Sequence, residues 1–390
     1  MTESHTARRW MGVGRSAERD SRMAAGAAAR EAMAGRVPKL LLVFAGIDHD
    51  WAALAESLRG VGAPVVGCST HGEIAPGGPS DGSVTVAAIG GPGFSVSAAV
   101  AEGVSGRQRE AGAEVAGCVS EVAGFPHRVL LLLTDGLLRD QESVLRGCYS
   151  VLGASVPLVG GAAADGWRMT GTFLIADGRV LTDAVVGVAI SSEAPLSVSV
   201  GHGWEKVGEP MIVTSSGNGR VYTLDDRPAM DVFLDRLGAP PAAYRDAAAF
   251  TEFALPRPLG VQRRRGIEAR NLSTEVDLEG RSIGGGSAID HGGLVWALRG
   301  DEESIMAATD AACEAALAGL GGDEPVGLVL FSCAALRAVL GDDGVRREVD
   351  RMAKWAARAP FAGFHTYGEI ARVRGIDGFH NQTLAVLALG

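Results

Sequence analysis

Two nine-residue stretches of the chain hold an acid between the same neighbours. Residues 67–75 and 363–371 are identical at six of their nine positions. The shared positions include a threonine, a glycine and a glutamate, which are Thr70, Gly72 and Glu73 in the first copy and Thr366, Gly368 and Glu369 in the second. A carboxylate in a glycine turn can bind the ammonium group of a ligand, or it can satisfy backbone N–H groups of its own turn. The repetition favours a binding site.

A third glycine-rich stretch, residues 157–166, contains Asp165 in place of the glutamate. The opposite charge, for a carboxylate on the ligand, could come from Arg337, on the helix expected after Ser332, or from N–H groups of the glycine turns. Asn381 is a further polar candidate near the third strand end. The predicted ligand-binding set is therefore Thr70, Gly72, Glu73, Asp165, Ser332, Arg337, Thr366, Gly368, Glu369 and Asn381.

Apolar runs of strand length flank each of these three stretches. One run precedes each stretch, at residues 40–44, 129–134 and 327–331, and one follows it, at 83–89, 184–190 and 383–389. A helix-like segment follows the first run, at 50–59, 141–152 and 342–358, and a short apolar strand that opens with Pro64, Pro157 or Pro360 then leads into the turn. Strands joined through such a helix are expected to be parallel neighbours. The glycine-acid turns should then lie at the carboxyl ends of strands, where open α/β sheets bind ligands.

The predicted fold is α/β, with repeated strand-helix-strand units in mixed sheets. We expect a strand and a helix within residues 1–37, a first region with two units at 38–238 and a second region with the third unit at 239–390. The second region should include a small antiparallel sheet, because residues 251–298 are rich in turns and short alternating runs. Asn218 and Gly219, between β-prone residues, predict a hairpin with a type I′ turn.

Composition excludes several classes of function. The chain has 390 residues, of which 47% are hydrophobic and 21% charged, as in globular proteins. A formal net charge of −10 argues against a nucleic-acid surface. Five scattered cysteines without zinc-ligand spacing predict no metal site and a reduced, cytoplasmic protein without cofactors. No apolar run reaches ~18 residues, so no membrane segment is expected.

The ordered series of motifs resembles FIST-domain proteins, with both the N-terminal and the C-terminal FIST region. The resemblance runs from about residue 38 to the end of the chain. It rests on the stretches at residues 65–74, 134–136, 157–161, 201–204, 222–225, 228–229, 331–333, 363–369 and 380–383.

The resemblance implies a sensory module that binds a small ligand, with an amino acid or similar metabolite as the expected ligand. FIST regions often accompany histidine kinase or cyclic-dinucleotide output domains. We recognise no such domain in this chain, so its signal is expected to pass to a separate partner protein. On this interpretation the protein is a stand-alone cytoplasmic sensor and not an enzyme.

Three alternatives stay open. Cys333 follows a strand and opens a helix, which could lower its thiol pKa for a hydrolase with His365 as base and Glu369 as its orienter. Some FIST proteins are reported to bind haem and sense nitric oxide, and His202 would then be the axial ligand. A ligand-free scaffold would turn Glu73 and Glu369 onto backbone.

Overall fold

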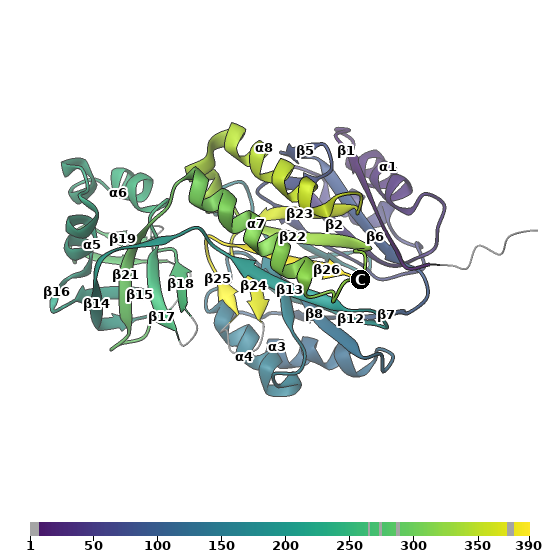
Figure 1. Ribbon diagram of the computed structural model, residues 1–390, viewed down its shortest axis with the longest axis horizontal. Helices are drawn as coiled ribbons and strands as arrows, with labels where there is room; N and C mark the ends of the chain where they lie inside the picture. Colours follow the sequence, from purple (N-terminus) through teal and green to yellow (C-terminus); the bar gives the residue numbers. More distant parts are fainter. Residues whose placement is uncertain (1–7, 264–265, 273–274, 286–288, 373–377) are drawn as a thin grey trace, which may run out of the picture.

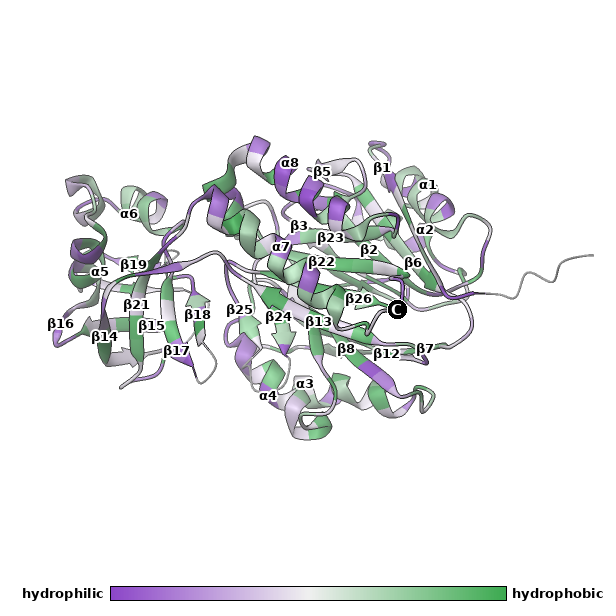
Figure 2. Ribbon diagram, in the orientation of Figure 1, coloured by the Kyte–Doolittle hydropathy of each residue, from purple (hydrophilic) through white to green (hydrophobic). Residues whose placement is uncertain are grey.

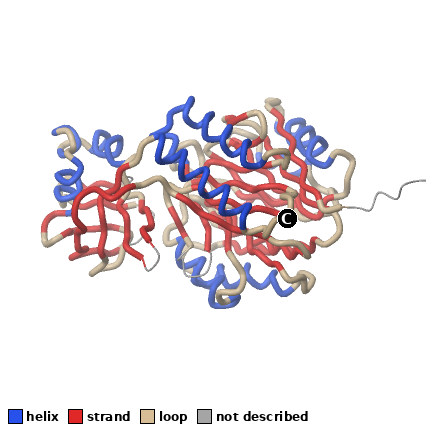
Figure 3. The backbone as a smooth tube through the Cα atoms, in the orientation of Figure 1, coloured by secondary structure: helices blue, strands red, loops and turns tan. Residues whose placement is uncertain are grey.

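The computed structural model describes residues 8–263, 266–272, 275–285, 289–372 and 378–390. The described strands form three six-stranded sheets in a large body and one eight-stranded sheet in a small domain. The small domain lies beside the body (Figure 1), and the helices of the body lie outside its strands (Figure 3). The predicted α/β class with mixed sheets is confirmed.

The body consists of three units with the same order of elements. The first unit contains β1 (Trp10–Ser16), α1 (Ser21–Met33), β2 (Pro38–Gly46), α2 (Trp51–Ser57), β3 (Val65–Thr70), β4 (Glu73–Ala75), β5 (Gly78–Ser80) and β6 (Val84–Gly90). The second contains β7 (Phe94–Glu102), α3 (Gln108–Ala116), β8 (His127–Thr134), α4 (Gln141–Leu152), β9 (Leu158–Ala162), β10 (Leu174–Ala176), β11 (Arg179–Leu181) and β12 (Ala184–Ser192). The third contains β13 (Leu196–Gly201), α7 (Glu302–Ala318), β22 (Gly327–Cys333), α8 (Arg337–Ala356), β23 (Phe361–Thr366), β24 (Glu369–Arg372), β25 (Phe379–His380) and β26 (Leu384–Leu389).

The observed unit is longer than the predicted one. Sequence patterns predict three strands and one helix per unit, whereas each unit also has a leading strand and helix and a two-stranded hairpin after the glycine turn. The strand and helix expected within residues 1–37 are β1 and α1, which belong to the first unit. The helix begins after Asp20, because the Asp20 side chain accepts a hydrogen bond from the Met23 amide at 2.9 Å.

The three sheets have the same strand order, and each is completed by a neighbouring unit. The pairs β2–β3, β8–β9 and β22–β23 are parallel, as predicted. The hairpin of the first unit pairs with β23, that of the second with β3 and that of the third with β9. The units therefore form a ring in which every sheet contains strands of two units.

One glycine in each unit permits close contact between the parallel strands. A β-carbon on Gly67 would lie 2.2 Å from the Val43 carbonyl oxygen. The equivalent atom on Gly160 or Gly363 would lie 1.9 Å from a carbonyl oxygen of β8 or β22. Any side chain at these positions would push the neighbouring strand away, which explains why the motif keeps this glycine.

The inner faces of the three sheets share one core. Buried residues from all three units pack there, and its centre contains Phe44, Phe331 and Phe364. The Phe44 and Phe364 ring centroids are 4.9 Å apart, and those of Phe331 and Phe364 are 5.7 Å apart. The outer faces are covered by two helices in each unit. The body strands are largely hydrophobic, whereas α8 carries many hydrophilic residues (Figure 2).

The small domain is inserted between β13 and α7. It contains β14 (Glu205–Gly217), β15 (Arg220–Leu224), β16 (Arg227–Pro228), α5 (Ala229–Leu237), α6 (Ala247–Ala254), β17 (Leu259–Arg263), β18 (Gly266–Arg270), β19 (Glu275–Asp277), β20 (Ser282–Gly284) and β21 (Leu294–Arg299). Its antiparallel sheet is larger than predicted, and α6 is an unexpected helix. The β14–β15 hairpin turns at Asn218 and Gly219 with φ of 52° and 74°, which fits the predicted type I′ turn. The predicted boundary between the two regions, at residues 238 and 239, falls inside the small domain, directly after α5.

Candidate functional site

The carboxyl ends of β3, β9 and β23 meet at one place in the body. The His71 amide donates to the His365 carbonyl at 3.0 Å, which joins the first turn to β23. The Ala162 amide donates to the Gly368 carbonyl at 2.8 Å, which joins β9 to the glycine turn of the third unit. The Ala164 amide donates to the Ser69 carbonyl at 2.8 Å, which closes the ring. All three glycine-acid stretches therefore border one region.

Three aromatic rings gather where these strands end. Trp167 stacks on Tyr367 with ring centroids 5.2 Å apart, and His71 contacts Trp167 edge to face at 5.1 Å. The Tyr367 hydroxyl donates to the Asp165 carboxylate at 2.6 Å and accepts from the Trp167 amide at 2.6 Å. His71 and Tyr367 occupy the same position in the two copies of the motif, between the threonine and the glycine.

Asp165 organises the loop that presents Trp167. Its carboxylate accepts hydrogen bonds from the amides of Met169, Thr170 and Gly171 at 2.8–3.2 Å. Burial alone would raise the pKa of Asp165, but these bonds and the Tyr367 hydroxyl lower it below its usual value. Trp167 and Met169 have φ of 65° and 53°, which is strained for bulky side chains. Strain of this kind concentrates at ligand sites.

The two glutamates of the repeated motif are fully buried and bind their own turns. Glu73 accepts from the Ser83 amide and hydroxyl at 2.8 Å, and Glu369 accepts from the Thr383 amide and hydroxyl at 3.1 and 2.9 Å. Each acid thereby fixes its turn to the start of the last strand of its unit, β6 or β26. Burial raises the pKa of Glu73 to about 7 and that of Glu369 to about 8.

Because of these raised pKa values, we expect the protein to become less stable as the pH rises from about 5 toward about 8. In that window the folded state keeps protons that the unfolded chain releases near pH 4.5. The stabilisation that comes from the protonated Glu73 and Glu369 is therefore fully present below the pKa of these groups in the unfolded chain. It is lost as the pH approaches their pKa values in the folded protein. In the parent protein the free energy of unfolding should fall between about pH 5.5 and about pH 7. Glu369→Gln should make this fall smaller by about 2 kcal/mol, as measured by urea unfolding at both pH values.

Glu303→Gln is the matched control, since Glu303 is an exposed acid in the first turn of α7. This variant should keep the pH dependence of the parent protein. Equal pH dependence in the parent and in Glu369→Gln would contradict the assignment of a protonated, buried Glu369.

A cavity of about 90 Å³ lies beside the aromatic rings. The second and third units and the small domain all contribute to its wall. The lining residues are Gly136, Leu138, Gln141, Trp167, Met169, Asn271, Cys333, Ala335, Thr366, Tyr367, Phe379 and Asn381. Thr366 and Asn381 belong to the set predicted from sequence. The predicted set omits the aromatic residues, although Tyr367 lies inside the repeated motif.

The other predicted residues do not line this cavity. Thr70 donates to Glu73, and Gly72 has φ of 123° and lies next to Arg337. Arg337 pairs with Asp81 at 2.8 Å and donates to the His71 carbonyl. Gly368 packs against Phe379, because a β-carbon there would lie 2.3 Å from the phenylalanine ring. Ser332 is fully buried at the end of β22.

The geometry around His202 does not fit a haem. Its Nε2 lies 3.0 Å from the Ile267 carbonyl, and its Nδ1 accepts from the Trp204 amide at 3.3 Å. Both ring nitrogens are therefore engaged, and the neighbouring cavity measures about 10 Å³. A macrocycle needs far more room.

Cys333 lines the cavity, but its environment does not activate a nucleophile. Burial, with a contribution from Glu369, raises the pKa of the Cys333 thiol well above its usual value. The expected base, His365, is fully buried, and neither of its ring nitrogens has a hydrogen-bond partner among the described residues. Burial also lowers the pKa of His365 to about 3.

Two further observations concern metal ions and membranes. In the described ranges, no group of three or more histidine, cysteine, aspartate or glutamate side chains could hold a metal ion. No helix there is both long enough and apolar enough to cross a membrane.

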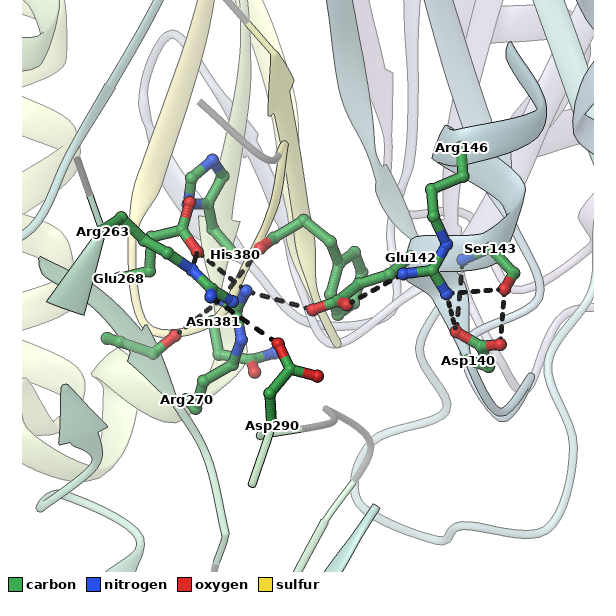
Figure 4. Close-up of polar contacts among 12 residues, drawn as sticks. Asp140, Glu142, Ser143, Arg146, Arg263, Glu268, Arg270, Asp290, His380 and Asn381 are labelled. Atoms are coloured by element: carbon green, nitrogen blue, oxygen red, sulfur yellow. Dashed lines mark hydrogen bonds and ion pairs between the residues drawn. The ribbon is translucent and has the colours of Figure 1, made fainter. Parts of the chain in front are cut away.

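A buried arginine links the small domain to the body next to the cavity. Arg270, at the end of β18, is fully buried and donates to Glu268 at 3.0 Å and to Glu142 of α4 at 3.1 Å. It also donates to the Phe379 carbonyl at 2.9 Å. Figure 4 shows Arg270 between Glu268 and Glu142. Asn271, the next residue, lines the cavity, so the ion-pair network and the cavity are adjacent.

Family models identify the chain. The FIST N domain matches residues 39–227 and the FIST C domain matches residues 229–372. The chain therefore belongs to the FIST family. FIST domains are generally sensory domains that bind small ligands in signalling proteins.

Two proteins from strains of Mycobacterium tuberculosis resemble the chain over nearly its whole length. They are the uncharacterized proteins MT0656 and Rv0628c, and each is 27% identical over 393 residues. The match covers 96% of this chain and 98% of each relative.

Proposed function

We propose that this protein senses a small metabolite, with amino acids and related amines as candidates, by binding it in the cavity beside Trp167 and Tyr367. The observation that carries the proposal is the position of the cavity, whose wall combines two body units with Asn271 of the small domain. Binding sites concentrate at the carboxyl ends of strands and between domains. The family's general role in small-ligand sensing supports the same conclusion.

The small domain would read out the bound ligand. Arg270 ties β18 to α4 and to the Phe379 carbonyl, and Phe379 also lines the cavity. A ligand that moves Phe379 or Asn271 would change the distances around the buried Arg270. Such a change alters how the small domain sits on the body, which a partner protein can detect.

The partner would be a cytoplasmic signalling protein, such as a histidine kinase or a cyclic-dinucleotide enzyme. The small domain offers it an exposed surface, since Ile212, Tyr222 and Leu294 are 49%, 40% and 43% exposed.

The test is a thermal-shift screen of purified protein against amino acids, amines and other small metabolites. A ligand that binds only the folded state stabilises it by about 2.7 kcal/mol at a concentration of 100 times its Kd. We expect at least one such ligand, and we expect Ala335→Leu to abolish its effect, because the larger side chain fills the cavity.

Met169→Phe is a second filling variant, at the exposed rim, for use if Ala335→Leu does not fold. Circular dichroism of each variant verifies the fold. A ligand that stabilises both filled variants as well as the parent protein would place the binding elsewhere, and a screen without any ligand would contradict the proposed function.

A further inference from the structure

The cavity wall selects for a particular ligand chemistry. Three of its lining residues are aromatic: Trp167, Tyr367 and Phe379. Besides the aromatic residues, its polar side chains are three amides, the Thr366 hydroxyl and the Cys333 thiol, and none of the described lining residues is charged. Aromatic faces attract cations, because the ring quadrupole is negative above and below the ring.

The charge behind the aromatic stack is negative. The Tyr367 hydroxyl donates a hydrogen bond to the carboxylate of Asp165 at 2.6 Å, and the loop amides keep that carboxylate ionised. A carboxylate at the hydroxyl end adds electron density to the tyrosine ring, which strengthens its attraction for a cation. Trp167 stacks on the same ring and extends this surface.

The positive charges that the structure describes near the cavity are already matched. Arg270, which contacts the Phe379 carbonyl, is paired with Glu268 and Glu142. Arg337, expected from sequence to bind a ligand carboxylate, is paired with Asp81 and lies outside the cavity wall. A ligand carboxylate in the cavity would therefore lack a charged partner among the described residues, and burying it would be costly.

The Gln141 side chain in the cavity wall offers a hydrogen-bond acceptor to a ligand. Gln141 is 3% exposed, and its Nε2 donates to the Asp135 carbonyl at 2.8 Å. Its Oε1 is buried and has no hydrogen-bond partner in the part of the chain that the structure describes. A buried acceptor left unpaired is unfavourable, so a ligand N–H group next to Gln141 would be stabilised.

We propose that the cavity binds the ammonium group of a small amine that has no carboxylate beside its nitrogen. A volume of about 90 Å³ fits such a head group but is well below that of a drug-sized pocket. The rest of the ligand extends toward Trp167 and Met169, which are 39% and 50% exposed. This inference rests on the proposed function of the same cavity and narrows its ligand class.

The test is isothermal titration calorimetry with two matched sets of probes. Ethanolamine is compared with glycine, which replaces the alcohol by a carboxylate. Choline, which has no N–H group for Gln141 and therefore tests the aromatic contribution alone, is compared with its neutral carbon isostere, in which a tert-butyl group replaces the trimethylammonium. We expect one cation or both to bind, and its neutral or zwitterionic counterpart to bind at least about tenfold more weakly.

Three variants test whether the aromatic cavity wall binds the cation. Trp167→Leu should weaken binding of the cation about tenfold, whereas Tyr222→Leu, at an exposed aromatic residue in the small domain, should leave it unchanged. Ala335→Leu should remove it.

Two results would overturn this inference in different ways. If glycine binds as tightly as ethanolamine, and Ala335→Leu removes glycine binding, the ligand class is wrong and the sensor proposal stands. If the cations bind equally well to the parent protein and to Ala335→Leu, the cavity is not their site and both proposals fail for these ligands.

Discussion

Phe364→Ala is expected to lower the free energy of unfolding by about 3–5 kcal/mol. Phe364 is fully buried at the centre of the shared core, where its ring contacts Phe44 of the first unit and Phe331 of the third. Truncation to alanine leaves a void that three sheets border, and paired rigid strands cannot collapse into it. Two aromatic pairs, each worth about 0.5–1.5 kcal/mol beyond burial, are lost as well. Urea unfolding followed by circular dichroism measures the loss.

Tyr222→Ala serves as the control for Phe364→Ala. Tyr222 is 40% exposed on β15 of the small domain, away from the shared core. Its truncation should lower stability much less. A similar, small loss in both variants would mean that the three units do not depend on one core.

Arg270→Ala is expected to destabilise the protein by about 3–5 kcal/mol, because it removes the fully buried partner of the Glu268 and Glu142 carboxylates. Arg270 is fully buried, and Glu268 is 5% exposed. Burial would raise the pKa of Glu268, but Arg270 and Arg263 lower it below its usual value. Without the Arg270 guanidinium, Glu268 keeps Arg263 and Glu142 keeps Arg146, but these arginine side chains are 26% and 56% exposed, so the two acids take up protons or draw in water more readily. The loss should therefore be smaller at a pH where these acids are protonated.

Arg139→Ala provides the matched comparison. Arg139 also links body and small domain, through Glu275 at 3.0 Å, but its side chain is 72% exposed. Solvent screens such a pair, so its removal should change stability little. An Arg270→Ala variant as stable as Arg139→Ala would show that the buried network does not hold the small domain to the body.

Local patterns were sufficient to predict most elements of the body. The segment 141–152 was predicted as a helix and is α4, and the apolar runs at 129–134 and 327–331 lie within β8 and β22. These strands are buried on both faces and therefore read as continuous apolar runs. The hairpin exchange was not predictable, because β4, β10 and β24 have only three or four residues and pair with strands of another unit.

The repeated motif identified the strand ends where the cavity lies, but it did not identify most of the wall. Glu73 and Glu369 recur because each fixes a turn to the last strand of its unit, which needs the same geometry in both units. Tyr367 stands between Thr366 and Gly368, which recur in the first copy of the motif. Its own position holds His71 in that copy, so the repeat did not mark it as a site residue. Gln141 and Asn271 reach the wall only through the packing of α4 and β18, which no local pattern encodes.

The ring of exchanged hairpins also means that no unit of the body is self-sufficient. A single unit cut out of the chain would lose the two strands that finish its own sheet, and its own hairpin would have no sheet to join. Removing one unit would thus leave one remaining sheet without its hairpin and one remaining hairpin without a sheet, and the unpaired strand edges would promote aggregation. The three units must therefore be kept or lost together, although each has the element content of a small domain.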